Sequence, residues 1–138
     1  MTPPPDTRLP WWRRWFGNRS ERAALHFLKR RGCRIVARNY LCPGGELDAV
    51  GLDGSCLVFI EVRSTAAADP ERPALSINTE KQRRMTHAAR HFLRRHGLRD
   101  RNCRFDVLIV CWPPNTRVPV IEHYPNAFEA VGKFQMDG

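Results

Sequence analysis

The chain has 138 residues, which is enough for one domain with a hydrophobic core. Hydrophobic residues make up 42% and charged residues 27%, as in soluble globular proteins, and no segment approaches the roughly 20 apolar residues that span a bilayer. The distinctive feature is a net charge of +9, from 23 Lys and Arg against 14 Asp and Glu. This excess favours a polyanionic partner, because basic side chains displace counterions from phosphate groups. Stable membrane insertion is excluded, and nucleic acid is the expected partner.

The five cysteines, at positions 33, 42, 56, 103 and 111, do not form a recognisable framework. Their number is odd and no two have the C-x-x-C spacing, which argues against a disulfide scaffold and against a structural zinc site. Free thiols in a reducing compartment explain them better. The N-terminus also lacks the continuous apolar core of a secretory signal, so we expect a cytoplasmic protein.

Residues 1–17 differ in composition from the rest of the chain. They are proline-rich at first and continue with the aromatic and basic stretch WWRRWF at 11–16. We expect a disordered basic and aromatic extension, followed by a single domain over residues 18–138. An alternative is that Trp11, Trp12 and Trp15 touch nucleic acid or a membrane surface, or dock an adaptor-like partner protein.

The first half of the domain predicts one helix and three strands. The helix covers 20–31, with Asn18 as its cap, Glu21 as the reciprocal capping partner and Gly32 after its end. A strand follows at 34–42, and two more strands are predicted on either side of a two-residue turn at Asp53-Gly54. Residues 64–78 are expected to form a loop.

The second half predicts a helix and one or two strands. Thr79 begins a helix whose apolar stripe follows the helical period and which Gly97 ends. Its opposite face is basic, and there we expect phosphate contacts from Arg83, Arg84, Arg90 and Arg94. The other interpretation of this face is ordinary solvated charge. Residues 104–112 are nearly all apolar, which predicts a buried strand, and 118–124 predict an edge strand.

Carboxylates gather on the predicted hairpin. The strand period of two places Leu57, Phe59, Glu61 and Arg63 on one face. A turn at Asp53-Gly54 then puts Asp48 opposite Phe59 and Glu46 opposite Glu61, so that Asp48 lies diagonally across from Glu61, about 7–8 Å away. Carboxylates that are crowded together lose hydration and repel each other. A bound divalent cation would offset this repulsion. The alternative is a structural ion pair between Glu61 and Arg63 or another arginine.

Four sequence blocks resemble a known family. GELDAV at 45–50, FIEVRS at 59–64, EKQRRM at 80–85 and RFDVLIV at 104–110 occur in order, after a first-helix segment at 20–40. Together they resemble the YraN-type family of small bacterial proteins with a restriction-endonuclease-like fold. The resemblance implies an α/β fold with a PD-(D/E)xK nuclease core of αβββαβ order, in which helices flank a central mixed sheet.

The same resemblance implies a function and a set of site residues. It implies a Mg²⁺- or Mn²⁺-dependent endonuclease that hydrolyses DNA, with branched DNA as a candidate substrate and a homodimer as a candidate assembly, by analogy with Holliday-junction resolvases. Asp48 and Glu61 match the metal-binding acids, and Arg63 stands at the lysine position. Glu21 matches a supporting acid on the first helix, and Gln82 resembles the glutamine of the resolvases. With Glu46 on the same predicted face, the candidate metal ligands are Asp48, Glu61, Glu46 and Glu21.

Several of these residues have simpler interpretations. Arg63 departs from the lysine and stays protonated, so it cannot act as a general base. Gln82 also fits a capping box with Thr79. Asp106 is expected to be structural and paired with Arg104 or a helix, and His87 and His91 are expected on the surface. The competing function is therefore a nucleic-acid-binding protein that keeps the nuclease fold without catalysis.

Overall fold

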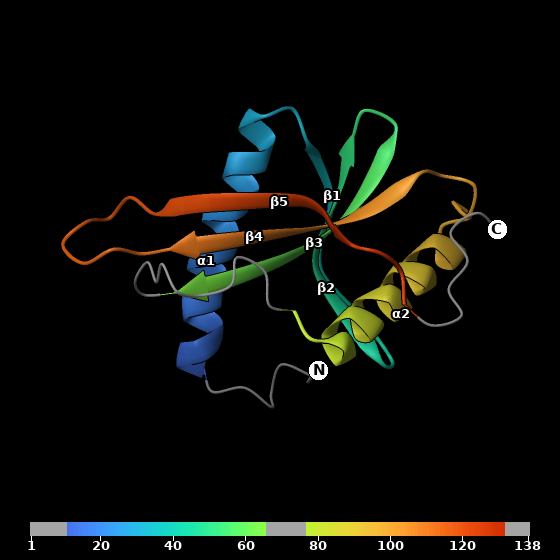
Figure 1. Ribbon diagram of the computed structural model, residues 1–138, viewed down its shortest axis with the longest axis horizontal. Helices are drawn as coiled ribbons and strands as arrows, with labels where there is room; N and C mark the ends of the chain where they lie inside the picture. Colours follow the sequence, from blue (N-terminus) through green and yellow to red (C-terminus); the bar gives the residue numbers. More distant parts are fainter. Residues whose placement is uncertain (1–10, 66–76, 132–138) are drawn as a thin grey trace.

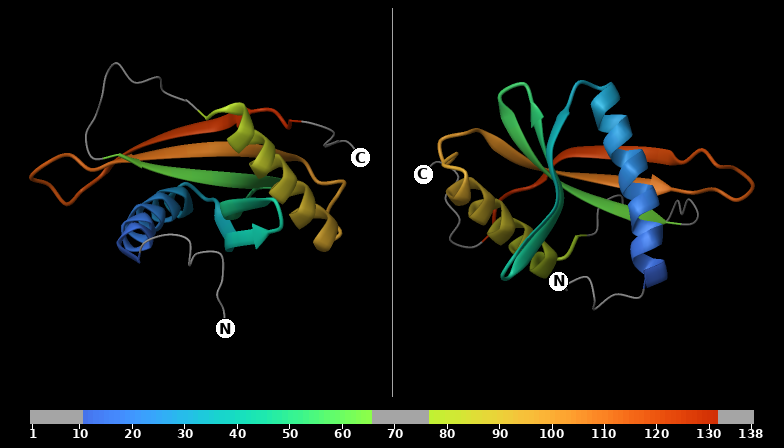
Figure 2. Two further views of the ribbon diagram at one scale, coloured as in Figure 1. Left: turned by 90° about the horizontal axis from the view of Figure 1, so that it is seen from below. Right: turned by 180° about the vertical axis from the view of Figure 1, so that it is seen from behind.

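The computed structural model describes residues 11–65 and 77–131, with the side chains of residues 11–18 excepted. The elements in chain order are α1 (Trp11–Arg30), β1 (Arg34–Cys42), β2 (Gly45–Asp53), β3 (Cys56–Thr65), α2 (Thr79–Arg95), β4 (Cys103–Cys111) and β5 (Val120–Phe128). The strands form one sheet in the order β1-β2-β3-β4-β5, in which β3 and β4 are parallel and the other neighbours are antiparallel. Figures 1 and 2 show the two helices on opposite sides of this sheet. The predicted αβββαβ core and its mixed sheet are confirmed, with β5 added at the edge.

Each helix covers its own hydrophobic core. On the α2 side, Leu57 and Phe59 of β3 pack with Met85 and Phe92, and on the α1 side Val58 and Ile60 pack with residues of α1. The predicted alternation of β3 is therefore confirmed, and β3 is buried on both faces as expected of a central strand. In the described part of the chain, no helix combines the length and apolar character needed to cross a membrane.

The start of α1 differs from the prediction. The helix begins at Trp11, so the expected start at Ser20 and the capping role of Asn18 are wrong. Residues 11–17, expected to precede the domain, are helical, and the rest of the predicted extension lies outside the described residues. Residues 11–30 contain no proline, which is compatible with a continuous helix over this range. The other end agrees, because Gly32 follows the helix with a φ of 93°.

The β2–β3 turn is shifted by one residue from its predicted place. Asp53 pairs with Cys56 and Leu52 with Leu57, so the two turn residues are Gly54 and Ser55. Gly54 has a φ of 63°, whereas neither Asp53 nor Ser55 has a positive φ. A turn with glycine first needs only that one positive φ, which explains why Asp53 stays in the strand. The predicted partners are corrected accordingly: Phe59 pairs with Val50, not with Asp48.

Two other boundaries also changed. Asn78, not Thr79, caps α2, since its side chain accepts a hydrogen bond from the amide of Lys81. The edge strand is longer than expected, because β5 pairs with β4 as far as Phe105 opposite Phe128. The predicted loop at 64–78 lies mostly outside the described residues, and its first two positions belong to β3.

Candidate active site

Asp48 lies where β2 separates from β3. The paired register of the two strands runs as far as Ala49 opposite Ile60. Beyond it, the amide of Val62 donates a hydrogen bond of 2.7 Å to Oδ2 of Asp48. At this position the acceptor for a β3 amide is therefore the Asp48 side chain and not a backbone carbonyl group of β2. This hydrogen bond holds the Asp48 carboxyl group beside Glu61, the neighbour of Val62 in the chain.

The two carboxyl groups influence each other strongly. Burial, together with the negative charge of Glu61, raises the pKa of Asp48 well above its ordinary value, although the Val62 hydrogen bond opposes the shift. Burial also raises the pKa of Glu61, whose side chain is 12% exposed, against the opposing effects of Lys81 and of a hydrogen bond with Asp48. The prediction that Asp48 and Glu61 come together is confirmed, although through a different register.

Lys81 completes this group and was not predicted from the sequence. Its Nζ lies 3.4 Å from Oε1 of Glu61 and 4.0 Å from Oε2 of Glu46. The cap formed by Asn78 starts α2 at a point where the first helical turn faces the carboxyl pair. The available signal was weak: Lys81 is one of only three lysines among 23 basic residues. The ammonium group partly neutralises a site that is otherwise rich in negative charge.

Arg63 and Gln82 have more peripheral positions than predicted. Arg63 is exposed on β3, and its positive charge is one of the influences that lower the pKa of Glu61. Glu61 forms an ion pair with Lys81, whereas the alternative considered from the sequence was a structural pair with Arg63 or another arginine. Gln82 donates from Nε2 to the carbonyl oxygen of Ile77 at 2.8 Å, which ties down the segment before α2. The predicted capping box with Thr79 is wrong.

Glu21 approaches the site from the opposite side of the sheet. Burial raises its pKa, Arg38 opposes the shift, and the charges of Glu61 and Glu46 add to it. Its neighbour Ser20 fixes this turn of α1, since the Ser20 hydroxyl donates to Ser64 at 2.7 Å and accepts from Trp112 Nε1 at 2.8 Å. The predicted proximity of Glu21 to the acidic pair is therefore supported, and its predicted capping role is wrong because it lies inside α1.

The donor set suits a hard divalent cation only in part. No group of three or more His, Cys, Asp or Glu side chains placed to hold a metal ion occurs among the residues that the structure describes. Glu46 is at the rim, with a side chain 58% exposed. Two carboxylates nevertheless fit Mg²⁺ or Mn²⁺, because Mg²⁺ usually keeps several waters and takes oxygen atoms from substrate phosphate. Asp48 and Glu61 are the residues that would hold such an ion.

The exposed face of α2 carries basic side chains along the helix, which begins beside this site. Arg83, Arg84, Arg90 and Arg94 are all exposed, as predicted, and Arg83 also pairs with Glu80 at 3.4 Å. Of the two histidines expected on the surface, His87 is exposed and hydrogen-bonds the carbonyl oxygen of Pro43 at 2.8 Å. The expectation that His91 lies on the surface is wrong, because this residue is only partly exposed and forms a hydrogen bond with the hydroxyl of Tyr40.

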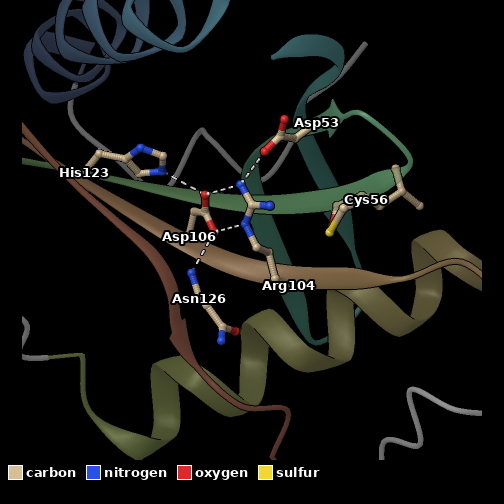
Figure 3. A network of polar contacts seen from close by, with 7 residues as sticks. Asp53, Cys56, Arg104, Asp106, His123 and Asn126 are labelled. Carbon is tan, nitrogen blue, oxygen red and sulfur yellow. Dashed lines mark hydrogen bonds and ion pairs between the residues drawn. The ribbon is translucent and has the colours of Figure 1, made fainter. Parts of the chain in front are cut away.

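A second polar network lies around Asp106 and is structural (Figure 3). The Asp106 side chain is fully buried and contacts Arg104 Nε at 2.9 Å, His123 Nε2 at 2.8 Å and the amide of Asn126 at 3.0 Å. Arg104 also forms an ion pair with Asp53 at 3.0 Å, so it connects β4 to the last residue of β2. The predicted pairing of Asp106 with Arg104 is confirmed. The five cysteines, all of them among the described residues, form no disulfide bond in the structure; Cys33 and Cys111 are buried and the other three are partly buried.

Comparison with known proteins is consistent over most of the chain. Residues 20–110 match the uncharacterised protein family UPF0102. This chain belongs to the UPF0102 family. A UPF0102 protein of Pelotomaculum thermopropionicum is 40% identical over 116 residues, which cover 84% of this chain and 97% of the relative. A UPF0102 protein of Geobacter sulfurreducens is 44% identical over 114 residues, covering 82% of this chain and 88% of the relative. The predicted YraN-type membership is thereby confirmed.

Proposed function

We propose that this UPF0102 protein is a metal-dependent endonuclease that hydrolyses DNA phosphodiester bonds. The observation that supports the proposal most directly is the Asp48–Glu61 pair, two desolvated carboxyl groups held together where β2 and β3 separate. Carboxyl groups whose pKa values are strongly perturbed by burial and by a specific neighbour are typical of functional sites. The excess of positive charge on the chain agrees with a polyanionic substrate.

Each residue of the site has a chemical role in this proposal. A divalent ion bound by Asp48 and Glu61 would activate a water for in-line attack and offset the negative charge that develops on the phosphate. Lys81 lies beside Glu61, where its ammonium group stabilises phosphate oxygens by charge. Arg63, which stays protonated, adds charge from the same strand and does not remove protons. The arginines of α2 bind the flanking phosphates and set the register of the substrate.

The proposal is tested by a cleavage panel. Linear, flapped and four-way DNA substrates are incubated with Mg²⁺, with Mn²⁺ and with EDTA. We expect cleavage only with a metal ion, and a loss of at least about 100-fold in Asp48→Asn and Glu61→Gln, as for removal of other transition-state stabilising groups. The matched control is Asp100→Asn, the same chemical change at an exposed position beyond the other end of α2. Equal cleavage by Asp48→Asn and the control would refute the proposal.

A second function is a nucleic-acid-binding protein without catalysis. Two observations favour it: the described residues contain no three-ligand metal group, and Lys81 already neutralises part of the acidic site. This alternative predicts salt-sensitive DNA binding that Asp48→Asn and Glu61→Gln leave unchanged, with no cleavage of any substrate in either metal.

A further inference from the structure

A cavity of about 480 Å³ lies at the end of α2 that is remote from the acidic pair. It is formed between β1, the β2–β3 hairpin, the last turns of α2 and the segment that follows. Its lining includes Val36, Tyr40, Leu52, Phe92, Arg95 and Arg101. The volume falls within the range of sites that bind small molecules or single chemical groups. None of the candidate site residues named above contributes to it.

The inside of this cavity is apolar and aromatic. Tyr40 and Phe92 meet edge to face with ring centroids 5.2 Å apart, and the ring of His96 lies 4.4 Å from that of Phe92. The hydrogen bond between the Tyr40 hydroxyl and His91 Nδ1 holds the Tyr40 ring in place. Val36 at the cavity is 46% exposed, so apolar surface remains open to solvent. Phe92 itself is buried, so a flat aromatic group that enters here would contact the partly exposed ring of Tyr40 and the exposed ring of His96.

The arginines at the cavity indicate which kind of molecule would carry the flat aromatic group. Arg95 and Arg101 belong to its lining, and Arg95 lies on the helix that presents Arg83, Arg84, Arg90 and Arg94 to solvent. Lys81 at the acidic site and Arg95 at the cavity are 14 residues apart on α2, a distance of about 21 Å along the helix axis. An occupant that satisfies both regions combines a flat aromatic group with a chain of negative charges. That description fits a nucleic-acid strand.

We propose that this cavity binds an unpaired base of the nucleic-acid substrate. In a continuous duplex the bases are stacked and paired, so a base enters such a cavity only from a flap, bulge, junction or single strand. With a rise of about 3.4 Å per base pair, the 21 Å along α2 corresponds to roughly six steps between the unpaired base and the phosphate at the acidic site. The substrate class is therefore DNA with an interrupted duplex. The inference relies on the proposed function for the nucleic-acid partner, but not on cleavage.

The test measures binding in EDTA, where no cleavage takes place. Two labelled DNA duplexes are compared, one fully paired and one with a single unpaired 2-aminopurine. We expect the second to bind about 5- to 150-fold more tightly, the range expected for stacking of one base on aromatic side chains. The 2-aminopurine fluorescence should change on binding, because the base leaves its stack in the DNA.

Matched variants assign this preference to the cavity. Val36→Glu places a carboxylate at the cavity and should abolish the preference for the unpaired base, with binding of the paired duplex reduced no more than in the control. The control is Val118→Glu, the same substitution at a valine that is 72% exposed in the β4–β5 connection. Ala37→Leu fills the cavity without changing the charge and should give the same loss of preference as Val36→Glu.

Three results would overturn the inference. They are equal binding of the two duplexes by the unmodified protein, equal effects of Val36→Glu and Val118→Glu, and no binding of either DNA. The cleavage panel is independent of these measurements. A protein that prefers the unpaired base but cleaves nothing would support the cavity and contradict the nuclease proposal.

Discussion

At the level of a single residue, Asp48 occupies a position in the candidate site that lowers the free energy of unfolding when its carboxyl group is ionised. Its carboxyl group is desolvated and next to Glu61, so ionisation is unfavourable in the folded protein and its pKa is raised. A group with a raised folded pKa stabilises the fold at low pH, and that stabilisation is lost as the pH rises from the unfolded pKa near 4 through the folded pKa. The fold is therefore less stable when both carboxyl groups are ionised than when Asp48 is protonated.

Asp48→Asn should stabilise the protein by about 1 kcal/mol at pH 7, the scale typical of relieving a functional-site conflict. Asparagine removes the charge and keeps an oxygen that can accept from the Val62 amide. Urea unfolding should show that the gain over the unmodified protein grows between pH 4 and pH 8. A loss of stability at pH 7 would contradict the raised pKa of Asp48 in the folded protein.

Asp106 behaves in the opposite way. Burial opposes its ionisation, but hydrogen bonds from His123, Arg104 and the Asn126 amide outweigh this effect and lower the pKa. A lowered folded pKa gives stability that is present above the unfolded pKa near 4 and is lost as the pH falls through the folded pKa.

Asp106→Asn should therefore destabilise the fold by about 3 kcal/mol at pH 7, as when one partner of a buried ion pair is removed. The difference from the unmodified protein should shrink as the pH falls from 5 to 3 in chemical denaturation. Asp53→Asn changes the exposed partner of Arg104 and should cost less than about 1 kcal/mol. A cost at Asp106 that does not vary with pH would contradict the assigned ionisation.

At the level of elements, the contact between α2 and β2 determines where Lys81 meets the carboxyl pair. Gly45 begins β2, and a Cβ atom there would lie 2.4 Å from the carbonyl oxygen of Arg84 and 3.1 Å from Cβ of Ala88. Helix and strand can approach this closely only because Gly45 has no side chain. The same approach brings the first turn of α2 toward Glu46 and Glu61.

Gly45→Ala should push α2 away from β2 and cost about 1–3 kcal/mol, the usual range for overpacking. Any metal-dependent cleavage should fall with it, since Lys81 moves with α2. Gly54→Ala is the control: it has open space but a φ of 63°, so it should cost about 1 kcal/mol of backbone strain and leave cleavage unchanged. Thermal unfolding and the cleavage panel measure the two effects, and a neutral Gly45→Ala would contradict the close approach.

At the level of the whole molecule, the net charge of +9 can attract a polyanion most strongly where the fold places several basic side chains close together. The exposed arginines of α2 lie along one helix that begins at the acidic pair and ends at the aromatic cavity. Under the proposed function, a polyanion that follows this helix would meet both sites.

Arg90→Ala should reduce the slope of log binding constant against log salt concentration by about 1, as expected for one lost phosphate contact. Arg117→Ala removes the same exposed charge from the β4–β5 connection and should leave the slope unchanged. Fluorescence anisotropy of labelled DNA over a range of salt concentrations measures both. Equal slopes for the two variants would show that α2 is not the contact surface.

Features that depend on local periodicity could be predicted from the amino-acid sequence. The alternation of residues 57–60 predicted a central strand between two cores, and the helical stripe ending at Leu93 predicted the buried face of α2. Local patterns also predicted the order of one helix, three strands, a helix and a strand, and the predicted hairpin placed Asp48 near Glu61, although with a register that the structure corrects. The family resemblance added the nuclease core and the assignment of these two residues as metal ligands. The local patterns follow from the sequence because side-chain direction repeats with the backbone of each element, whatever lies around it.

The contacts between elements could be known only from the folded chain. The one-residue shift of the turn to Gly54-Ser55, the hydrogen bond from Val62 to Asp48, and the approach of Lys81 to Glu61 depend on how strands pair and where α2 packs. Several turns and caps are compatible with the same local residues, and their energies differ by amounts that packing easily outweighs. The aromatic cavity had no sequence signal for the same reason, since residues from β1, β2, β3, α2 and the following segment meet there only after folding.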